Sequence, residues 1–328
     1  MNRSKSIKTK FEACLYLTAG NQLNKTADRK PSYRKMLNSM NTYDRRTVLK
    51  GFAAWAVLAA VNVPWLGFGT GNKRRYRIGA CDWSIGKQCD TGALELAGIL
   101  GLDGVQVSLG AVQNGMHLRR KVVQQAYLEA VAAHGVKISS LAIGELNNVP
   151  YKSEPETEEW VRGSIYAAKA LGCRVVLLAF FGKGDIRGDG AGIAEVIRRL
   201  KKVAPLAEKE DVILGIESWL SADELLAIIG EVGSSHVRVY YDVANATEMG
   251  YDIYHEMKQL GSEYICEVHA KENGALLGQG KIDFKKVRHA LDGIGYGGWV
   301  VLEGGVPAGM DVNEAYLANT RFIRSVFG

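Results

Sequence analysis

The sequence predicts a single (β/α)8 barrel, and three observations support this prediction. From about residue 76 onward, eight short apolar runs alternate with longer amphipathic segments, the last of which follows the final run. Strict strand–helix alternation implies parallel strands joined by right-handed crossovers. The runs are continuously apolar, which indicates strands buried on both faces, and eight such units in about 250 residues match the size of this barrel.

Eight apolar runs are the predicted strands. Each is rich in β-branched, aliphatic or aromatic residues, as strands are. They span residues 76–83, 104–109, 136–143, 174–181, 212–218, 237–243, 264–271 and 299–305. An open doubly wound sheet is the alternative, but no Gly-x-Gly-x-x-Gly motif follows the first run, so the barrel is favoured.

The longer segments predict helices, because their apolar residues recur at helical spacing. The clearest are residues 118–135, 154–172, 192–210 and 282–295. Three of the segments end at a glycine (Gly135, Gly172 and Gly295), which predicts C-caps. Ser221 and Asp283 stand where two helices should begin and are expected N-caps.

Charge divides the chain into a basic front segment and an acidic body. Residues 1–75 hold 15 Lys and Arg against three Asp and Glu, whereas residues 76–328 hold 26 against 32. A nucleic-acid-binding body would need a basic surface for phosphate contacts, so we expect no nucleic-acid partner. The five cysteines include no Cys-x-x-Cys, and buried free thiols are expected; a Cys81–Cys89 bridge is the alternative.

The front segment resembles a twin-arginine (Tat) export signal. Arg45 and Arg46 precede an apolar stretch over residues 51–66, shorter than the roughly 20 residues of a bilayer span. We therefore expect a polar extension that is disordered or not translated (1–39), a signal segment (40–72) and a barrel domain (73–328). This predicts export to the periplasm, with membrane contact only through an uncleaved signal. A cytoplasmic protein, with a basic patch before a buried helix, is the alternative.

Four potential metal ligands end four consecutive predicted strands: Glu217, Asp242, His269 and Glu303. In such a barrel the carboxyl ends of the strands carry the chemistry, and neighbouring strands lie about 4.8 Å apart. Three buried carboxylates would be unfavourable without a cation, although a single one is more often a helix cap or an ion-pair partner. The set therefore predicts one divalent metal ion, of Mn²⁺, Mg²⁺, Co²⁺ or Zn²⁺. The small residues Val-Ala-Asn-Ala after Asp242 suggest a turn.

Four motifs in the second half of the chain carry a family resemblance. They are Ile-Glu-Ser at Glu217, Tyr-Asp-Val-Ala-Asn-Ala at Asp242, His-Ala-Lys-Glu at His269, and the segment 278–303. That segment combines Gly-x-Gly, an Ile-Asp-Phe helix start, Gly-Tyr-x-Gly and a strand ending in Glu303. These motifs resemble the sugar phosphate isomerase/epimerase family with the xylose isomerase-like TIM barrel. The resemblance implies that these same four residues hold one metal ion.

The resemblance also implies a metal-dependent sugar isomerase or epimerase that works by proton transfer through a cis-enediolate. Glu217 and Glu303 would be the catalytic pair on opposite faces of the substrate carbon, one removing the proton and the other returning it. The metal would polarise the carbonyl and hydroxyl oxygens of the substrate. Because phosphorylated sugars are scarce outside the cytoplasm, the expected substrate is a free sugar or sugar derivative.

Three other functions stay open. A keto-glycoside lyase or hydratase would use the same metal site but expel a group from the substrate. A non-catalytic carbohydrate-binding barrel would bind without turnover, against which the intact ligand set argues. An AP endonuclease would need further histidines for three zinc ions, whereas Asn245 replaces the expected histidine after Asp242 and no Asp-x-His follows His269.

Five further residues are candidate substrate contacts: Lys271, Glu145, Asn245, Trp83 and His117. Lys271 should point to the same side as the histidine two residues before it, unless it forms an ion pair with a neighbouring loop. Glu145 ends the third strand and is either a substrate contact or a capping acid. Trp83 is an aromatic wall or a core residue, and His117 a substrate contact or a solvated loop residue. Asn245 is expected to orient a ligand from behind.

Overall fold

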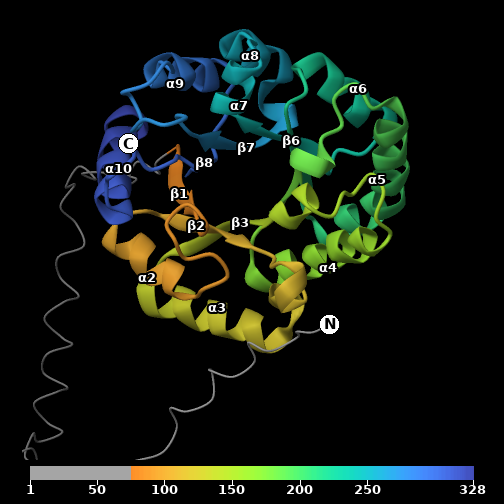
Figure 1. Cartoon of the computed structure of the whole chain (residues 1–328), viewed down its shortest axis with the longest axis horizontal. Helices are drawn as coiled ribbons and strands as arrows, with labels where there is room; N and C mark the ends of the chain where they lie inside the picture. The colour runs from red at the N-terminus through yellow and green to blue at the C-terminus, as the bar shows by residue number, and fades with distance from the viewer. Residues whose placement is uncertain (1–74) are drawn as a thin grey trace, which may run out of the picture. The chain divides into compact units, whose positions relative to one another are not determined.

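Eight parallel strands close into a barrel in the computed structural model, which describes residues 75–328 (Figure 1). Each strand pairs with the next in the chain, and β1 pairs with β8. The strands are β1 Arg77–Cys81, β2 Gly104–Ser108, β3 Lys137–Ile143, β4 Val175–Phe180, β5 Ile213–Ser218, β6 Val237–Asp242, β7 Ile265–Ala270 and β8 Trp299–Leu302. The predicted fold class is confirmed. The expected extension (1–39) and signal segment (40–72) lie outside the described residues.

The helices form a ring around the strands (Figure 1). They are α2 Gly92–Ile99, α3 Lys121–His134, α4 Glu156–Leu171, α5 Gly190–Glu210, α6 Ala222–Val232, α7 Val243–Glu248, α8 Ile253–Tyr264, α9 Phe284–Gly293 and α10 Val312–Phe327. Gly135 and Gly172 are left-handed C-caps of α3 and α4, as predicted, whereas the C-cap of α9 is Ile294 and not Gly295. Ser221 forms a capping box with Glu224 at the start of α6, and Asp283 caps α9.

One local expectation is wrong. The Val-Ala-Asn-Ala stretch after Asp242 is not a turn but the start of helix α7. The Asp242 carboxylate accepts hydrogen bonds from the backbone N–H groups of Ala244 and Asn245, both at 2.8 Å, and so satisfies donors that a helix start leaves free. Two helices, α7 and α8, therefore connect β6 to β7.

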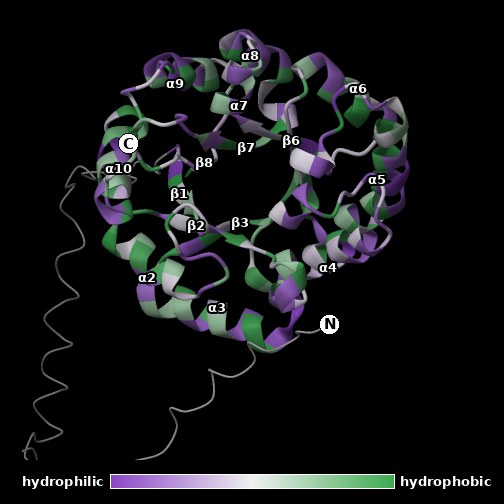
Figure 2. Cartoon of the chain, viewed as in Figure 1, coloured by the Kyte–Doolittle hydropathy of each residue, from purple (hydrophilic) through white to green (hydrophobic). Residues whose placement is uncertain are grey.

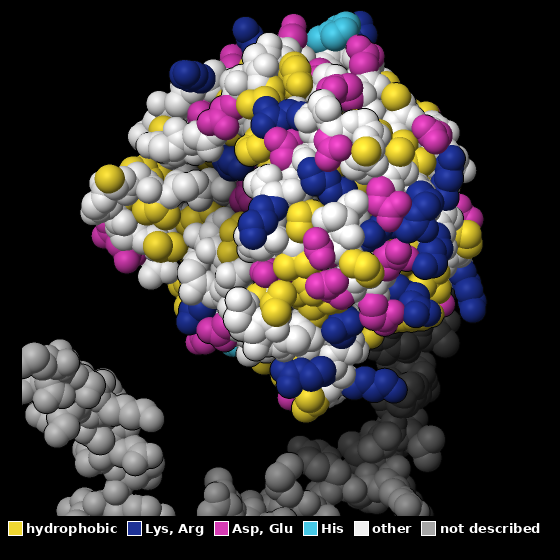
Figure 3. Space-filling model, turned by 45° about the vertical axis from the view of Figure 1, so that its right-hand side comes forward, with side chains coloured by type: hydrophobic (Ala, Val, Ile, Leu, Met, Phe, Trp, Pro, Cys, Tyr) yellow, Lys and Arg dark blue, Asp and Glu magenta, His cyan; other side chains and the backbone are white. Residues whose placement is uncertain are grey.

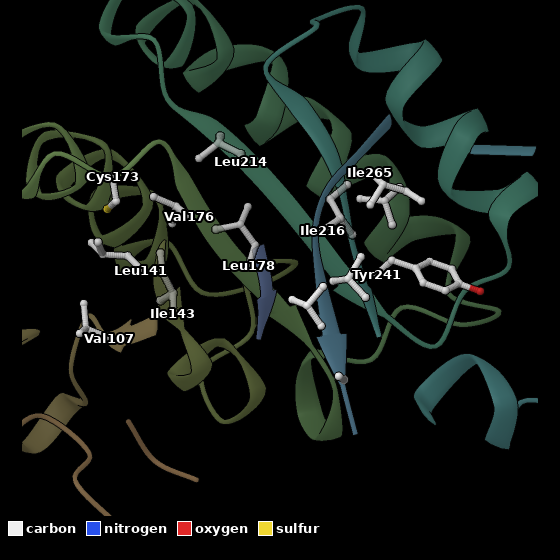
Figure 4. Packing of buried hydrophobic residues seen from close by; sticks show 14 of the residues in the cluster. Val107, Leu141, Ile143, Cys173, Val176, Leu178, Leu214, Ile216, Tyr241 and Ile265 are labelled. Carbon is white, nitrogen blue, oxygen red and sulfur yellow. The ribbon is translucent and has the colours of Figure 1, made fainter. Parts of the chain in front are cut away.

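Apolar side chains fill the space between the barrel wall and the helix ring. Alternate residues of the strands point outward, among them Leu141, Val176, Leu178, Leu214 and Ile216, and pack in one cluster beneath the helices (Figure 4). The helices carry both hydrophobic and hydrophilic residues (Figure 2), as is typical of helices that pack one face against a core. Cys81 and Cys173 are buried free thiols, as expected, and Cys89 is also free.

The inside of the barrel is filled by a separate set of side chains. Leu177, Ile213 and Tyr240 belong to an inner apolar cluster, and Trp299 with Val301 forms another. Gly104 leaves room for the Trp299 ring, because a Cβ at this position would lie 2.5 Å from it. The barrel is thus a packed core that can hold side chains in fixed positions at its ends.

Positive and negative side chains are interspersed on the face of the molecule that Figure 3 shows. Within residues 75–328, no helix combines the length and the apolar character needed to cross a membrane.

Candidate functional site

The carboxyl ends of β5 to β8 bring four potential metal ligands together. Glu217 is the penultimate residue of β5, Asp242 the last of β6, and His269 the penultimate of β7. Glu303 follows β8 directly, and the pairing of β6 with β7 sets Asp242 beside His269. One ligand atom from each side chain lies within 4.8 Å of all the others. The strand-end pattern of the sequence thus corresponds to one cluster in space.

The Nδ1 atom of His269 faces the three carboxylates of this cluster. It lies 2.8 Å from Glu217 Oε1, 3.4 Å from Glu303 Oε2 and 3.8 Å from Asp242 Oδ2. Burial by itself lowers the pKa of His269, but the Glu303 and Glu217 carboxylates outweigh it and raise that pKa to about 9. Burial also raises the pKa of Asp242. The negative charge of the three carboxylates therefore favours a proton or another cation at Nδ1.

The other ring nitrogen of His269 is held from behind by Gln106 of β2. Its Nε2 atom lies 2.8 Å from Gln106 Oε1. The Gln106 amide donates to Ser140 Oγ at 3.0 Å, and the Ser140 hydroxyl donates to Glu267 at 2.7 Å. Because Ser140 has only one proton and gives it to Glu267, it must accept from the NH₂ group of Gln106.

This chain of hydrogen bonds fixes the tautomer of His269. The carbonyl oxygen of Gln106 is left to face Nε2, so Nε2 carries a proton and donates it. In the neutral imidazole the lone pair is then on Nδ1, the nitrogen that faces the three carboxylates. An acceptor that orients a metal-binding histidine in this way is the usual arrangement behind such ligands.

A divalent cation fits these residues on three grounds. The donor set is three carboxylates and one imidazole, which suits hard to borderline divalent ions. In its neutral form, His269 directs the Nδ1 lone pair into the cluster. Asp242 Oδ2 is buried and makes no hydrogen bond, while its partner oxygen caps α7. Its nearest cation is the Lys271 ammonium at 3.2 Å, which meets the distance for an ion pair but not the geometry of a hydrogen bond.

A cavity of about 310 Å³ opens over this cluster. Of the four potential ligands, Glu217 and Glu303 line it, whereas Asp242 and His269 do not. The side chains of Asp242 and His269 are 1% and 0% exposed, against 4% for Glu217 and 17% for Glu303. The cluster therefore has a deep half, which can only bind a cation, and a half that can also meet a substrate.

Three of the five predicted substrate contacts lie at this site. Trp83 and Glu145 line the cavity, and the Trp83 indole N–H donates to Glu303 Oε1 at 3.2 Å. The Lys271 ammonium lies 3.1 Å from Glu303 Oε2. Lys271 thus points to the same side as His269, and its ion pairs are with the cluster itself.

Like Lys271, the other two predicted contacts, Asn245 and His117, do not line the cavity. Asn245 is buried in α7, and its backbone N–H holds Asp242 in place. His117 is 8% exposed, so the alternative of a solvated loop histidine is wrong. Its ring packs edge-on against Tyr127, with ring centroids 6.3 Å apart.

Sequence reasoning did not single out the polar residues beneath the cluster: Gln106, Ser140, Tyr240 and Glu267. The Tyr240 hydroxyl donates to Glu267 at 3.0 Å, and burial raises the pKa of Glu267 to about 8. The signal was present, because a Gln or Glu within a continuously apolar strand should have a partner inside the barrel. The spacing of two between Glu267 and His269 also places both on one face.

The chain matches one protein family along most of its length. The family model described as "Xylose isomerase-like TIM barrel" matches residues 94–326. A 2-epi-5-epi-valiolone 7-phosphate 2-epimerase from an Actinoplanes species is 26% identical over 225 residues, which cover 66% of this chain and 82% of that protein.

Solved structures of epimerases share the fold. D-psicose 3-epimerase from Clostridium cellulolyticum, solved with D-tagatose, superposes with a TM-score of 0.64 at 16% identity and covers 76% of this chain and 99% of its own. A 3-keto-D-glucoside 4-epimerase from E. coli, solved in its apo form, has the same TM-score and the same coverage at 14% identity. At these identities the likeness concerns the fold.

Proposed function

Because the chain belongs to the xylose isomerase-like TIM barrel family, we propose that it is a divalent-metal-dependent sugar isomerase or epimerase. Its substrate would be an unphosphorylated ketose or keto-sugar derivative. One observation carries this proposal: only Glu217 and Glu303 of the four clustered residues line the cavity. They are the two groups that can both bind a cation and reach the carbon of a substrate.

The four clustered residues would hold the metal, with His269 binding through Nδ1. When bound, the metal supplies a Lewis acid that stabilises negative charge on substrate oxygens. Asp242 and His269, which lie beneath the cavity, contribute ligand atoms only.

Glu217 and Glu303 would move the proton. One carboxylate removes the hydrogen from the carbon beside the carbonyl, and the electron pair moves onto the carbonyl oxygen to give an enediolate. The other glutamate, protonated at the start, returns a proton to the opposite face of that carbon for epimerisation. For isomerisation the proton goes instead to the former carbonyl carbon, and the hydroxyl proton of the first carbon passes to the former carbonyl oxygen. The indole N–H of Trp83, which donates to Glu303, would hold that carboxylate in orientation.

Lys271 would contact a substrate oxygen. Its ammonium lies between Asp242 Oδ2 and Glu303 Oε2, at 3.2 and 3.1 Å. Lys271 does not line the cavity, so a substrate oxygen would have to lie beside Glu303 to accept a hydrogen bond from this ammonium.

The cavity walls favour a substrate without a phosphate group. No Lys or Arg is among the lining residues, which instead include Glu145, Asn147, Asn148, Trp83 and Phe181. Amides and aromatic faces suit the hydroxyl groups and apolar faces of a sugar. Outside this lining, Arg187 forms an ion pair with Asp185 and stacks on the Trp219 ring at 4.4 Å.

The first test is hydrogen exchange at the substrate carbon. The full chain, loaded with Mn²⁺, would be incubated in D₂O with free ketohexoses and with keto-glycosides, and the products followed by NMR and mass spectrometry. We expect one deuterium at the epimerised carbon, and about one equivalent of metal by plasma mass spectrometry. Glu217→Gln and Glu303→Gln should abolish the exchange, whereas Glu145→Gln, which also lines the cavity, should retain it in part.

The same assay contains the outcomes that would contradict the proposal. Loss of a water or alcohol mass from the product would favour a lyase or hydratase at this site. Sugar binding without exchange would favour a non-catalytic barrel. Equal metal content in the wild type and in an Asp242→Asn variant would remove the cluster as the metal site.

A further inference from the structure

A second cavity, of about 590 Å³, lies at the opposite end of the barrel, where the strands begin. Its walls are formed by residues at or near the starts of the strands, such as Ile213 of β5 and Trp299 of β8, together with the loop before β8. None of the four clustered ligands lines this cavity. It is therefore a site separate from the proposed active site.

Four basic side chains surround this mouth: Arg77, Lys137, Arg174 and Arg238. They come from β1, from β3, from the residue before β4 and from β6, so they are distributed around the barrel and are not a run on one helix. Positive side chains that approach from several directions can together attract one anion.

The side chains of two of these arginines leave the backbone on the inner side of the barrel wall. Tyr240, two residues after Arg238, packs on the His269 ring at 4.4 Å inside the barrel. Alternate residues of a strand share a face, so Arg238 begins on that same face. The Arg77 guanidinium stacks over the Trp299 ring at 4.5 Å, which limits its freedom and keeps it at the cavity wall.

The positive charge at this mouth is mostly uncompensated. Arg174 pairs with Asp211. Among residues 75–328, no carboxylate lies within 4.0 Å of Arg77, Lys137 or Arg238 in an ion pair. Glu267 is the one acidic residue of the lining, and its carboxylate accepts the hydroxyl groups of Ser140 and Tyr240 on the inner side. Three cations without an ion-pair partner thus face at most one negative charge, and of these Arg238 donates from Nε to the Ser235 carbonyl at 3.0 Å.

A buried hydroxyl at the same wall lacks a partner. Ser139 is 3% exposed, lines the cavity, and its Oγ makes no hydrogen bond. It lies where the pairing of β2 with β3 shifts register, so it has no opposite residue in β2. A buried hydroxyl left without a partner is unfavourable, and a ligand oxygen in the cavity would satisfy it.

We propose that this amino-terminal mouth binds a small phosphate-type anion, either inorganic phosphate or the phosphate group of a small molecule. Planar guanidinium groups match the oxygens of a phosphate and can donate two hydrogen bonds each. Ser139 supplies a neutral donor, and the cavity volume lies in the range of small-molecule sites. The site is a binding site remote from the chemistry, and it stands whether or not the proposed function holds.

The test is calorimetric titration of inorganic phosphate into the full chain at constant ionic strength. We expect one saturable site in the wild type and in Asp242→Asn, since that variant removes binding at the metal centre. The double variant Arg77→Gln, Arg238→Gln should bind phosphate at least about tenfold more weakly, because it loses two charge-assisted donors. The matched control Lys121→Gln, Arg321→Gln removes two exposed charges elsewhere and should bind as the wild type does.

Lys137→Gln keeps the test decisive if the double variant does not fold. Lys137 is exposed and makes no side-chain hydrogen bond within the described part of the chain, so its loss should weaken phosphate binding without affecting the fold. The proposal is overturned if the wild type shows no saturable binding below about 10 mM phosphate. It is overturned equally if Lys137→Gln and the control pair bind phosphate with the same affinity.

Discussion

At the scale of single residues, the chemistry of the site depends on groups that do not touch the metal position. His269 can offer Nδ1 to a cation only while Nε2 carries the proton, and that choice is made by Gln106, Ser140 and Glu267. The terminal acceptor is the Oε2 atom of Glu267, from which the direction of each hydrogen bond follows. If one hydrogen bond of this series ran in the other direction, neutral His269 would carry its proton on Nδ1, and no lone pair would face the carboxylates.

Replacing Gln106 with Leu should therefore weaken metal binding although all four ligands remain. His269 Nε2–H would lose its acceptor, and residues that orient a metal ligand in this way typically contribute about 10- to 100-fold in affinity. Titration of Mn²⁺ followed by calorimetry measures this change. Gln88→Leu is the control, because Gln88 lines the cavity and has no bond to His269. Equal affinities for the two variants would show that the hydrogen bond does not orient the histidine.

Asp82, at the end of the first strand, gives a pH-dependent prediction away from the metal cluster. It is fully buried and accepts from the backbone N–H of Ser108, the Ser108 hydroxyl and the backbone N–H of Cys89. Burial raises its pKa from 3.8 to about 6, although these hydrogen bonds oppose the rise. Between these two pH values the folded chain binds a proton that the unfolded chain does not, so stability falls as pH rises from about 4 to about 6.

The Asp82→Asn variant should not show this loss of stability as the pH rises. The amide keeps an acceptor for both N–H groups, and its NH₂ can donate to the Ser108 hydroxyl. Its free energy of unfolding, relative to that of the wild type, should rise by about 2.5 kcal/mol between pH 4 and pH 7, from a pKa difference of about 2 units. Urea denaturation of both proteins in EDTA measures this. A difference that is independent of pH would mean that Asp82 is ionised throughout.

At the scale of helices and strands, Asp242 links the fold to the site. Its carboxylate ends β6, caps α7 with one oxygen and directs the other into the cluster. The sequence pattern placed all eight strands and the four cluster residues, because strand ends are visible as the limits of apolar runs. Helix α7 escaped prediction because its residues are small and its cap is the same carboxylate that was assigned to the metal.

Two substitutions of Asp242 should separate its roles. Asp242→Asn keeps an oxygen to cap α7, whereas Asp242→Ala removes it, so the alanine variant should be about 1 kcal/mol less stable than the asparagine variant. Both should lose metal binding, since neither has the carboxylate. Urea denaturation in EDTA and metal analysis give the two readouts. Equal stability of the two variants would show that α7 does not depend on this cap.

The sequence indicates that Gln106 and Glu267 need partners inside the barrel, but it does not show which residues meet them or what forms the cavity walls. Whether Gln106, Ser140 and Glu267 meet depends on how eight strands stagger in the closed barrel, including the irregular pairings of β2 with β3 and β6 with β7. The walls of the cavity come from loops such as η3 (Gly144–Asn147), whose conformation no periodic pattern specifies. Residues whose positions follow from the periodicity of strands and helices could thus be predicted. Residues whose positions depend on how the barrel closes could not.

At the scale of the whole molecule, the charge distribution and the proposed export both favour an unphosphorylated substrate. The barrel part is acidic, the residues before it are strongly basic, and no cation lines the active-site cavity. An exported enzyme would meet unphosphorylated sugars, which is what such a cavity suits. The proposed export signal and the proposed substrate therefore support each other, although they rest on different residues.

Export can be tested by changing two residues of the proposed signal. Arg45→Lys with Arg46→Lys preserves the charge of the segment while removing the twin arginines, so a purely electrostatic role would be unaffected. We expect the wild-type chain in the periplasmic fraction of a bacterium with a Tat system and the double-lysine variant in the cytoplasm. Lys73→Arg with Arg74→Lys is the control, since it changes basic residues outside the motif. If both variants fractionate with the wild type in the cytoplasm, the basic front segment serves a purpose other than export, and phosphorylated sugars return as substrates to be assayed.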